Sequence, residues 1–188
     1  DYKPIADYLT KVIGTRFTYY HPNTWAEYSA KMHAESFDLV FDGPHFVDWR
    51  VDKIGHNLLL KLPKIDRWTV IARVDDNTIN NMHDVIGKKA CAPGSPNFGK
   101  LNMMRHYSYP NKQHVHVKVK GWNNVYNGVK EGKCEVGVLP HTNHLLFDRD
   151  NTYTKSIHKH LPYPNQGMTY GPKISPQLAS RIKAELLS

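Results

Sequence analysis

Residues 92–100, APGSPNFGK, hold a serine and a proline between glycines, a pattern typical of the first turn of a helix. In such a turn Ser95 caps the helix and Pro96 occupies its first position. A helix N-terminus carries about half a positive charge and several N–H groups that have no partner within the helix. The pattern therefore predicts either a simple helix cap or a site where these N–H groups and the Ser95 hydroxyl bind an oxyanion.

The histidines are the second group that could do chemistry, because some of the 12 alternate along the chain. His114 and His116 are two residues apart, as are His158 and His160, so each pair shares one face of a strand. Such pairs could bind Zn²⁺ or Cu²⁺. The other ligands of a closed site are not evident, and basic proteins often carry surface histidines. We therefore expect no metal and no cofactor, and keep histidine-based metal binding as an alternative function.

The two cysteines, Cys91 and Cys134, form neither a CxxC motif nor a zinc pattern, which leaves one disulfide or two buried thiols. Cys91 lies near the carboxyl end of its expected strand, and Cys134 lies near the amino end of its own. If these strands are parallel neighbours, the Cα atoms lie farther apart than the ~7 Å that a disulfide tolerates. This register favours two free, buried thiols.

The motifs of common enzyme classes are absent from the sequence. It contains no GxSxG, HExxH, P-loop or GxGxxG pattern, and acid–base pairs such as Asp75-Asp76 or His83-Asp84 rest on adjacency alone. We therefore expect a protein that is not an enzyme.

The formal net charge of +8 favours anionic partners, and the length of 188 residues allows one domain or two small lobes. Lys and Arg are scattered rather than gathered in a basic run, so we expect no nucleic-acid partner. The longest apolar run, Leu58–Leu62, contains Lys61 and falls far short of the ~18 residues of a membrane helix. Asp1 is followed almost at once by helix-like sequence, which predicts a cytosolic protein or a mature or trimmed form of a secreted one.

Helical and strand patterns alternate along most of the chain. Helices are expected at residues 4–14, 24–34, 77–85, 95–107, 123–133 and 175–187, and strands at 16–20, 37–43, 68–74, 87–93, 114–122 and 134–140. This order is typical of an α/β fold with parallel strands. It predicts one lobe from residues 1–74 with 146–188 and a second from 75–145, with crossing segments near 72–76 and 145–150.

Ligands of open α/β sheets bind beyond the carboxyl ends of the strands. This rule selects Asp42–His45, Gly94-Ser95 and Pro140–Thr142, and we expect all three stretches to face one cleft between the lobes. Asp42 would repel an anion unless it is paired, so we expect it to be a hydrogen-bonding turn residue. Among the tryptophans, Trp25 begins a helix after a strand and is the best candidate to reach the cleft.

Several stretches resemble one known family when they are taken in order. These are PIADYL, FDLVFDGPHF, VIGKKACAPGSPNFGKL, GWNNVYNGVKEGKCEVGVLP, LPYPNQ and SPQLASRIKAELL. Their order and spacing are similar to the substrate-binding proteins of phosphate, phosphite and phosphonate ABC transporters, over nearly the whole chain. The resemblance implies the type II periplasmic binding-protein fold, with two α/β lobes whose mostly parallel sheets are flanked by helices, and a ligand cleft between the lobes.

The resemblance also implies which residues bind the anion. Ser95, Asn97, Phe98 and Gly99 match the family's loop at the start of the second-lobe helix. His45 matches the residue after the first-lobe strand, and His141 and Thr142 match the third wall of the cleft. Asn97 and Phe98 stand where the family often has hydroxyl residues, so this loop has fewer hydroxyl donors.

The function that follows is an extracytoplasmic solute-binding protein, monomeric, that captures a small oxyanion of phosphonate, phosphite or phosphate type by hinge closure. It would deliver the anion to an ABC permease. We expect a periplasmic or extracellular location, and the full-length form could carry a lipid anchor. Family members begin with a strand before the first helix, whereas this chain starts at the helix, so the chain is expected to be trimmed or to lack that strand. The alternative is a ligand-sensing domain of a receptor or regulator with the same fold.

Overall fold

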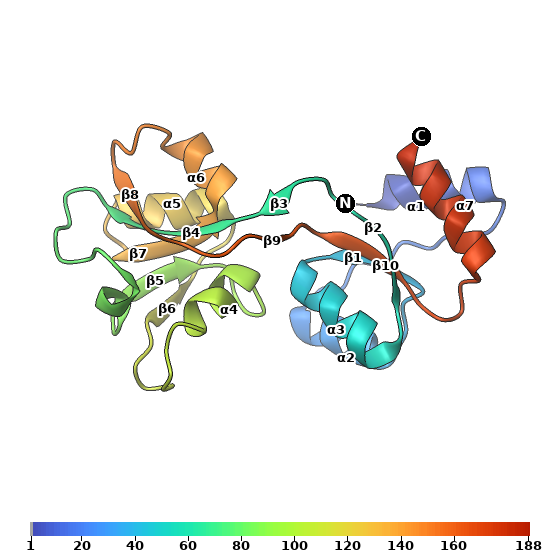
Figure 1. Cartoon of the computed structure of the whole chain (residues 1–188), viewed down its shortest axis with the longest axis horizontal. Helices are drawn as coiled ribbons and strands as arrows, with labels where there is room; N and C mark the ends of the chain where they lie inside the picture. Colours follow the sequence, from blue (N-terminus) through green and yellow to red (C-terminus); the bar gives the residue numbers. More distant parts are fainter. Residues whose placement is uncertain (1) are drawn as a thin grey trace. The chain divides into compact units, whose positions relative to one another are not determined.

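The computed structural model describes residues 2–188, which form two compact units (Figure 1). Unit 1 is the described part of Asp1–Lys64 together with Pro164–Ser188, and unit 2 is Ile65–Tyr163. Two short strands that pair with each other, β3 (Ile65–Asp66) and β9 (Tyr163–Pro164), mark the crossings between them.

These crossings differ from the ones expected near residues 72–76 and 145–150. The reason is strand pairing: β4 (Trp68–Arg73) pairs with both β7 (Val136–Pro140) and β8 (Thr154–Lys159). The segments of β4 and β8, which were both assigned to the first lobe, are therefore strands of the sheet of unit 2.

Unit 1 packs helices around a small sheet. Its helices are α1 (Lys3–Ile13), α2 (Trp25–His33), α3 (Pro44–Ile54) and α7 (Pro176–Leu187); its strands, in sheet order, are β1 (Leu39–Asp42), β10 (Gly167–Tyr170) and β2 (Asn57–Lys61). Both neighbouring pairs are antiparallel. Because β10 is the central strand, β1 is an edge strand of this sheet. The core contains Leu9 and Ile13 of α1, Met168 of β10 and Ile182 of α7.

Local signals set the helix ends of unit 1 as expected. Thr24 accepts a hydrogen bond from the Glu27 N–H at the start of α2, and Ser175 accepts one from the Leu178 N–H at the start of α7. The strand predicted at residues 16–20 does not form. The Phe17 N–H donates instead to the Thr10 hydroxyl (2.9 Å), which ties this segment to α1.

Unit 2 is built on a five-stranded mixed sheet. The strand order is β6 (Val115–Lys118), β5 (Lys89–Ala92), β7, β4, β8, and the helices are η1 (Met82–Val85, a 3₁₀ turn), α4 (Phe98–Met104), α5 (Trp122–Lys130) and α6 (His141–Phe147). β5 runs parallel to β6 and β7, whereas β4 runs antiparallel to β7 and β8. The predicted α/β class is confirmed. The expectation of a mostly parallel sheet in each lobe is wrong for unit 1, whose described strand pairs are antiparallel, and the parallel pairs lie in unit 2. No helix among residues 2–188 is long and apolar enough to cross a membrane.

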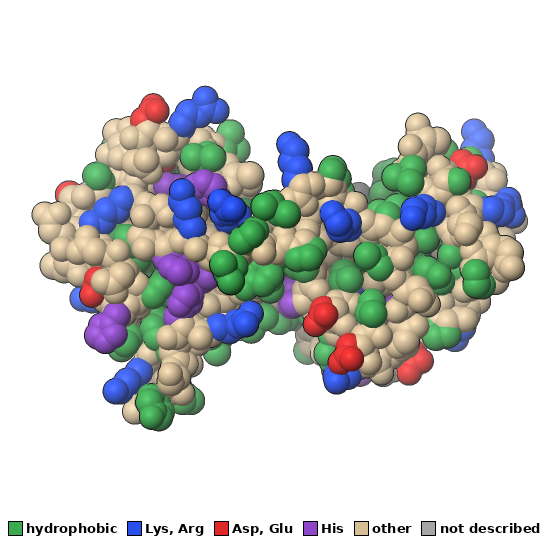
Figure 2. All heavy atoms as spheres, viewed as in Figure 1, with side chains coloured by type: hydrophobic (Ala, Val, Ile, Leu, Met, Phe, Trp, Pro, Cys, Tyr) green, Lys and Arg blue, Asp and Glu red, His purple; other side chains and the backbone are tan. Residues whose placement is uncertain are grey.

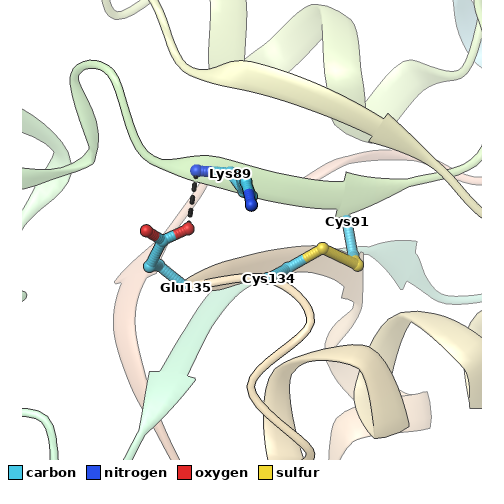
Figure 3. The surroundings of a disulfide bond; sticks show 4 residues. All are labelled: Lys89, Cys91, Cys134 and Glu135. Carbon is cyan, nitrogen blue, oxygen red and sulfur yellow. Dashed lines mark hydrogen bonds between the residues drawn. A yellow bond between two sulfur atoms is a disulfide. The ribbon is translucent and has the colours of Figure 1, made fainter.

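The prediction of free thiols is wrong, because Cys91 and Cys134 form a disulfide with their Cα atoms 5.7 Å apart (Figure 3). Cys134 precedes β7 rather than lying in it, and its N–H donates to the Gly128 carbonyl at the end of α5. The connection therefore lays Cys134 over β5 instead of extending the strand register. The neighbouring Glu135 carboxylate accepts a hydrogen bond from the Lys89 N–H (2.8 Å) and fastens the same connection to β5.

Candidate functional site

The first candidate region lies in unit 2, where the parallel strands β5 and β7 end at Ala92 and Pro140, at the same edge of the sheet. The turn of residues 93–97 follows β5 and leads into α4. The helix begins at Phe98, so the expectation that Ser95 caps it is wrong. Asn97 is the cap, and its side-chain oxygen accepts hydrogen bonds from the Gly99 N–H (3.0 Å) and the Lys100 N–H (3.3 Å).

Ser95 is held by a different contact. The Lys100 ammonium donates to the Ser95 hydroxyl oxygen over 2.9 Å, which places a positive charge directly on the turn. A Cβ added at Gly94 would lie 3.0 Å from the Cε of Lys118, so the Lys118 side chain also passes over this turn. The hydroxyl and both lysines therefore meet where β5 ends.

Phe98 and Gly99 are part of the packing beneath this edge. The Phe98 ring lies edge-on to Trp68 (6.2 Å between centroids) and to Tyr163 (4.8 Å). A Cβ added at Gly99 would lie 2.5 Å from the Trp68 ring, so only glycine allows α4 to approach β4 this closely. Both residues position the turn of Ser95.

The matching end of β7 carries His141 and Thr142, the first residues of α6. The His141 N–H donates to the Arg67 carbonyl (2.7 Å), which joins this end to the start of β4. Burial lowers the pKa of the His141 imidazole, and the charges of Lys159 and Arg67 lower it further. Thr142 is exposed.

The charge around this edge is positive. Burial lowers the pKa of His116, and the nearby ammonium groups of Lys100 and Lys118 add to the effect. Lys and Arg side chains are prominent on the face of unit 2 in Figure 2, where acidic side chains are sparse. An anion at this edge would meet lysine ammonium groups together with neutral imidazoles.

The second candidate region lies in unit 1 around Asp42, which ends β1. Its carboxylate accepts two hydrogen bonds of 2.7 Å from the Arg50 guanidinium and a third from the Tyr28 hydroxyl. The Arg50 Nε also donates to Thr169 of β10 (2.9 Å), and Arg50 is completely buried. Burial raises the pKa of the Tyr28 hydroxyl, and the Asp42 carboxylate raises it further. As expected, Asp42 is a hydrogen-bonding residue, and its charge is compensated.

The two sequence-derived candidates of unit 1 contact the same aromatic ring. Trp25 stacks on Phe46 with an interplanar angle of 18°, and the His45 ring lies against Phe46 with centroids 4.1 Å apart. Trp25 is 52% exposed, so it has surface to offer a ligand. Trp25 and Asp42 also line a groove of about 1020 Å³ that follows the unpaired edge of β1.

Several residues that shape these regions are not among the candidates expected from the sequence, above all Arg50, Tyr28, Lys100 and Lys118. Lys100 had a usable signal, because it lies five residues after Ser95 and can reach back over a helix start. Arg50 had none, since its partners Asp42 and Thr169 come together only when the sheet forms.

Comparison with known proteins decides the family. The family model described as "ABC transporter, phosphonate, periplasmic substrate-binding protein" matches residues 1–188. The chain belongs to this family. The resemblance found in the sequence is thus confirmed, and members of this family are substrate-binding transport proteins. The family implies a small ligand, a membrane permease as partner and an extracytoplasmic location.

Solved structures show the same fold at low sequence identity. XAC2383 from Xanthomonas citri bound to ATP superimposes with a TM-score of 0.77 at 16% identity, over 98% of this chain and 77% of that one. The arginine-bound form of truncated ArgBP from T. maritima gives a TM-score of 0.59 at 12% identity, over 98% and 82%. The GluR0 ligand-binding core from Nostoc punctiforme in complex with (L)-glutamate gives 0.61 at 12% identity, over 98% and 82%. No curated protein matches the chain.

Proposed function

We propose that this chain captures a small oxyanion of phosphonate, phosphite or phosphate type and delivers it to an ABC permease. Family membership supports the transport role. The observation that carries the choice of an anion is the turn after β5, where the Lys100 ammonium lies 2.9 Å from the Ser95 hydroxyl and the Lys118 side chain passes over Gly94.

In this proposal the lysines compensate for the small number of hydroxyl groups in the loop. Asn97 uses its side-chain oxygen to cap α4, which leaves its amide N–H₂ for a ligand. Hydrogen bonds from an ammonium group to an oxyanion are about twice as strong as those between neutral groups. Ser95 and Lys100 would therefore be the main anion contacts, with His141 and Thr142 at the neighbouring edge.

The proposed contribution of unit 1 comes from Trp25 and His45, which share the Phe46 ring. Closure would be a hinge motion at the crossings of the chain, after Lys64 and after Tyr163. The ligand would drive closure by binding the closed form more tightly than the open form. The protein would act as a monomer outside the cytoplasm.

The test is a thermal-shift and calorimetric screen of metal-free protein against phosphate, phosphite, methylphosphonate, aminoethylphosphonate and sulfate. A ligand at a hundred times its dissociation constant adds about 2.7 kcal/mol to the free energy of unfolding. We expect one of the phosphorus anions to bind, and Ser95→Ala and Lys100→Met to weaken it by about 10- to 100-fold, as for hydrogen bonds to charged groups.

The matched control is Lys133→Met, which removes an exposed lysine from the connection before β7, at the opposite edge of the sheet. This variant should bind like the parent protein. Lack of binding by every phosphorus anion, or equal losses in Lys100→Met and Lys133→Met, would overturn the proposal.

A further inference from the structure

Three histidines of unit 2 come together at a place that the proposed anion site does not use. His106 follows α4, while His158 lies in β8 and His160 directly after it. Their ring centroids are 4.5 Å (His106–His158), 4.7 Å (His158–His160) and 5.2 Å (His106–His160) apart. One ring nitrogen from each lies within 4.8 Å of the other two.

The fold explains why these rings meet. His158 pairs with Val70 of β4, and the His160 N–H continues the pairing by donating to the Trp68 carbonyl (2.9 Å). Side chains two residues apart along a strand point to the same face, so both rings lie on one side of β8. His106, which follows α4, reaches the same two rings from another element.

One of the three nitrogen–nitrogen distances already suits a tetrahedral metal. Zn–N bonds of 2.0–2.1 Å in a tetrahedron separate the ligand nitrogens by about 3.3 Å. The Nε2 of His106 and the Nδ1 of His160 are already 3.3 Å apart. His160 is only 6% exposed, and its Nε2 has no hydrogen-bond partner within residues 2–188. The buried His160 ring therefore directs its Nδ1 at His106, while its Nε2 has no partner among the described residues.

The state of the rings is compatible with metal binding. Burial lowers the pKa of each imidazole, that of His160 to about 3, so the rings are neutral near pH 7 and can each offer a lone pair. The positive charge of Arg105 lowers the pKa of His106 and His160 further and opposes a cation. The Arg105 guanidinium donates a hydrogen bond to the Tyr163 hydroxyl (3.4 Å) and keeps its charge.

We propose that His106, His158 and His160 form a binding site for a divalent transition metal, with Zn²⁺ as the best-fitting ion. Three protein ligands leave the fourth position to water, as in open zinc sites. His106 is exposed, so the ion can enter from solvent. His114 and His116 take no part, because β6 and β8 are the two outermost strands of the five-stranded sheet.

The test uses the full chain, stripped with a chelator and titrated with Zn²⁺ in competition with a chromophoric chelator. We expect one equivalent to bind, and Co²⁺ to give the visible absorption of a tetrahedral site. His106→Gln and His158→Gln should each lower the Zn²⁺ affinity by at least ~10-fold, because even the loss of a residue that only supports a metal ligand lowers the affinity by that factor. His83→Gln, at an exposed histidine of the same unit, is the matched control and should bind like the parent.

The outcomes separate this proposal from the proposed function. His106 is exposed and lies outside the proposed anion site, so His106→Gln should remain folded without metal and should retain anion binding. Absence of bound Zn²⁺ in the parent protein would overturn the metal site. An affinity in His106→Gln and His158→Gln equal to that of His83→Gln would do the same, because the metal would then sit on other histidines.

Discussion

At the scale of single residues, the most demanding feature is the buried guanidinium of Arg50. Its charge is completely removed from solvent, and its ion-pair partner is Asp42, whose side chain is 16% exposed. Leaving one member of such a pair without its partner costs about 3–5 kcal/mol, since a buried charge is then uncompensated. Asp42→Asn keeps the size of the side chain but removes the carboxylate, and we expect a loss of that size in the free energy of unfolding, measured with urea.

The matched control is Asp75→Asn, which removes a carboxylate bound to an exposed arginine. The Arg73–Asp75 pair is 3.1 Å long, with 43% and 75% of the side chains exposed. Exposed pairs contribute about 0–1 kcal/mol, so this variant should unfold nearly like the parent protein. Similar losses in Asp42→Asn and Asp75→Asn would show that the buried network does not stabilise unit 1.

At the scale of elements, α5 packs on the sheet of unit 2 through Gly128. A Cβ added at Gly128 would lie 2.7 Å from the Cys91 sulfur. Replacing glycine by alanine inside a helix normally stabilises it by up to ~1 kcal/mol. Here the close contact with the Cys91 sulfur should make the substitution destabilising instead. We expect Gly128→Ala to lower the free energy of unfolding by ~1–3 kcal/mol, as in other overpacked cores.

Two further variants isolate the cause of this loss. Asn123→Ala, at an exposed position of the same helix, should be neutral or slightly stabilising. In a Cys91→Ala/Cys134→Ala background the sulfur is gone, so Gly128→Ala should cost less than it does in the parent protein. An equal cost in both backgrounds would locate the strain elsewhere in α5.

Elements whose signals are local were predictable from the sequence. Gly14, in the left-handed conformation at φ 77°, ends α1, and Ser175 caps α7, because a few neighbouring residues determine each end. Elements that depend on distant partners were not predictable from the sequence. β8 and β10 lie in a polar tail and form only because β4, β1 and β2 offer them edges.

The candidate sites divide in the same way. The turn around Ser95 was found from its own residues, whereas its helix cap was placed too early because Asn97 competes for the same N–H groups. The pairing of Cys91 with Cys134 depends on how the connection after α5 folds over β5. His106 carried no periodic signal at all, since its partners His158 and His160 belong to another element.

At the scale of the whole molecule, imidazoles that lose solvent on folding make stability depend on pH. Burial is the first cause of a lowered pKa for a set of histidines in both units: His56, His106, His114, His116, His141, His144, His158 and His160. For His114 the pKa falls from 6.5 to about 4. Protonation would also add to a net charge that is already +8.

The sign of the effect follows from proton binding. Between pH 6.5 and about 4 the unfolded chain binds a proton at His114 that the folded chain does not. The contribution of neutral His114 to the free energy of unfolding is therefore fully present above pH 6.5. The free energy of unfolding falls as the pH decreases below 6.5, by at most about 1.4 kcal/mol per pH unit for each such group. We expect urea unfolding of metal-free protein to show this decline, and His114→Gln to make it shallower.

His83→Gln, at an exposed position, should leave the slope unchanged. A slope in His114→Gln as steep as in the parent protein would mean that other groups cause the acid sensitivity, because the neighbours of His114, which are His116 and Lys100, remain in place in that variant.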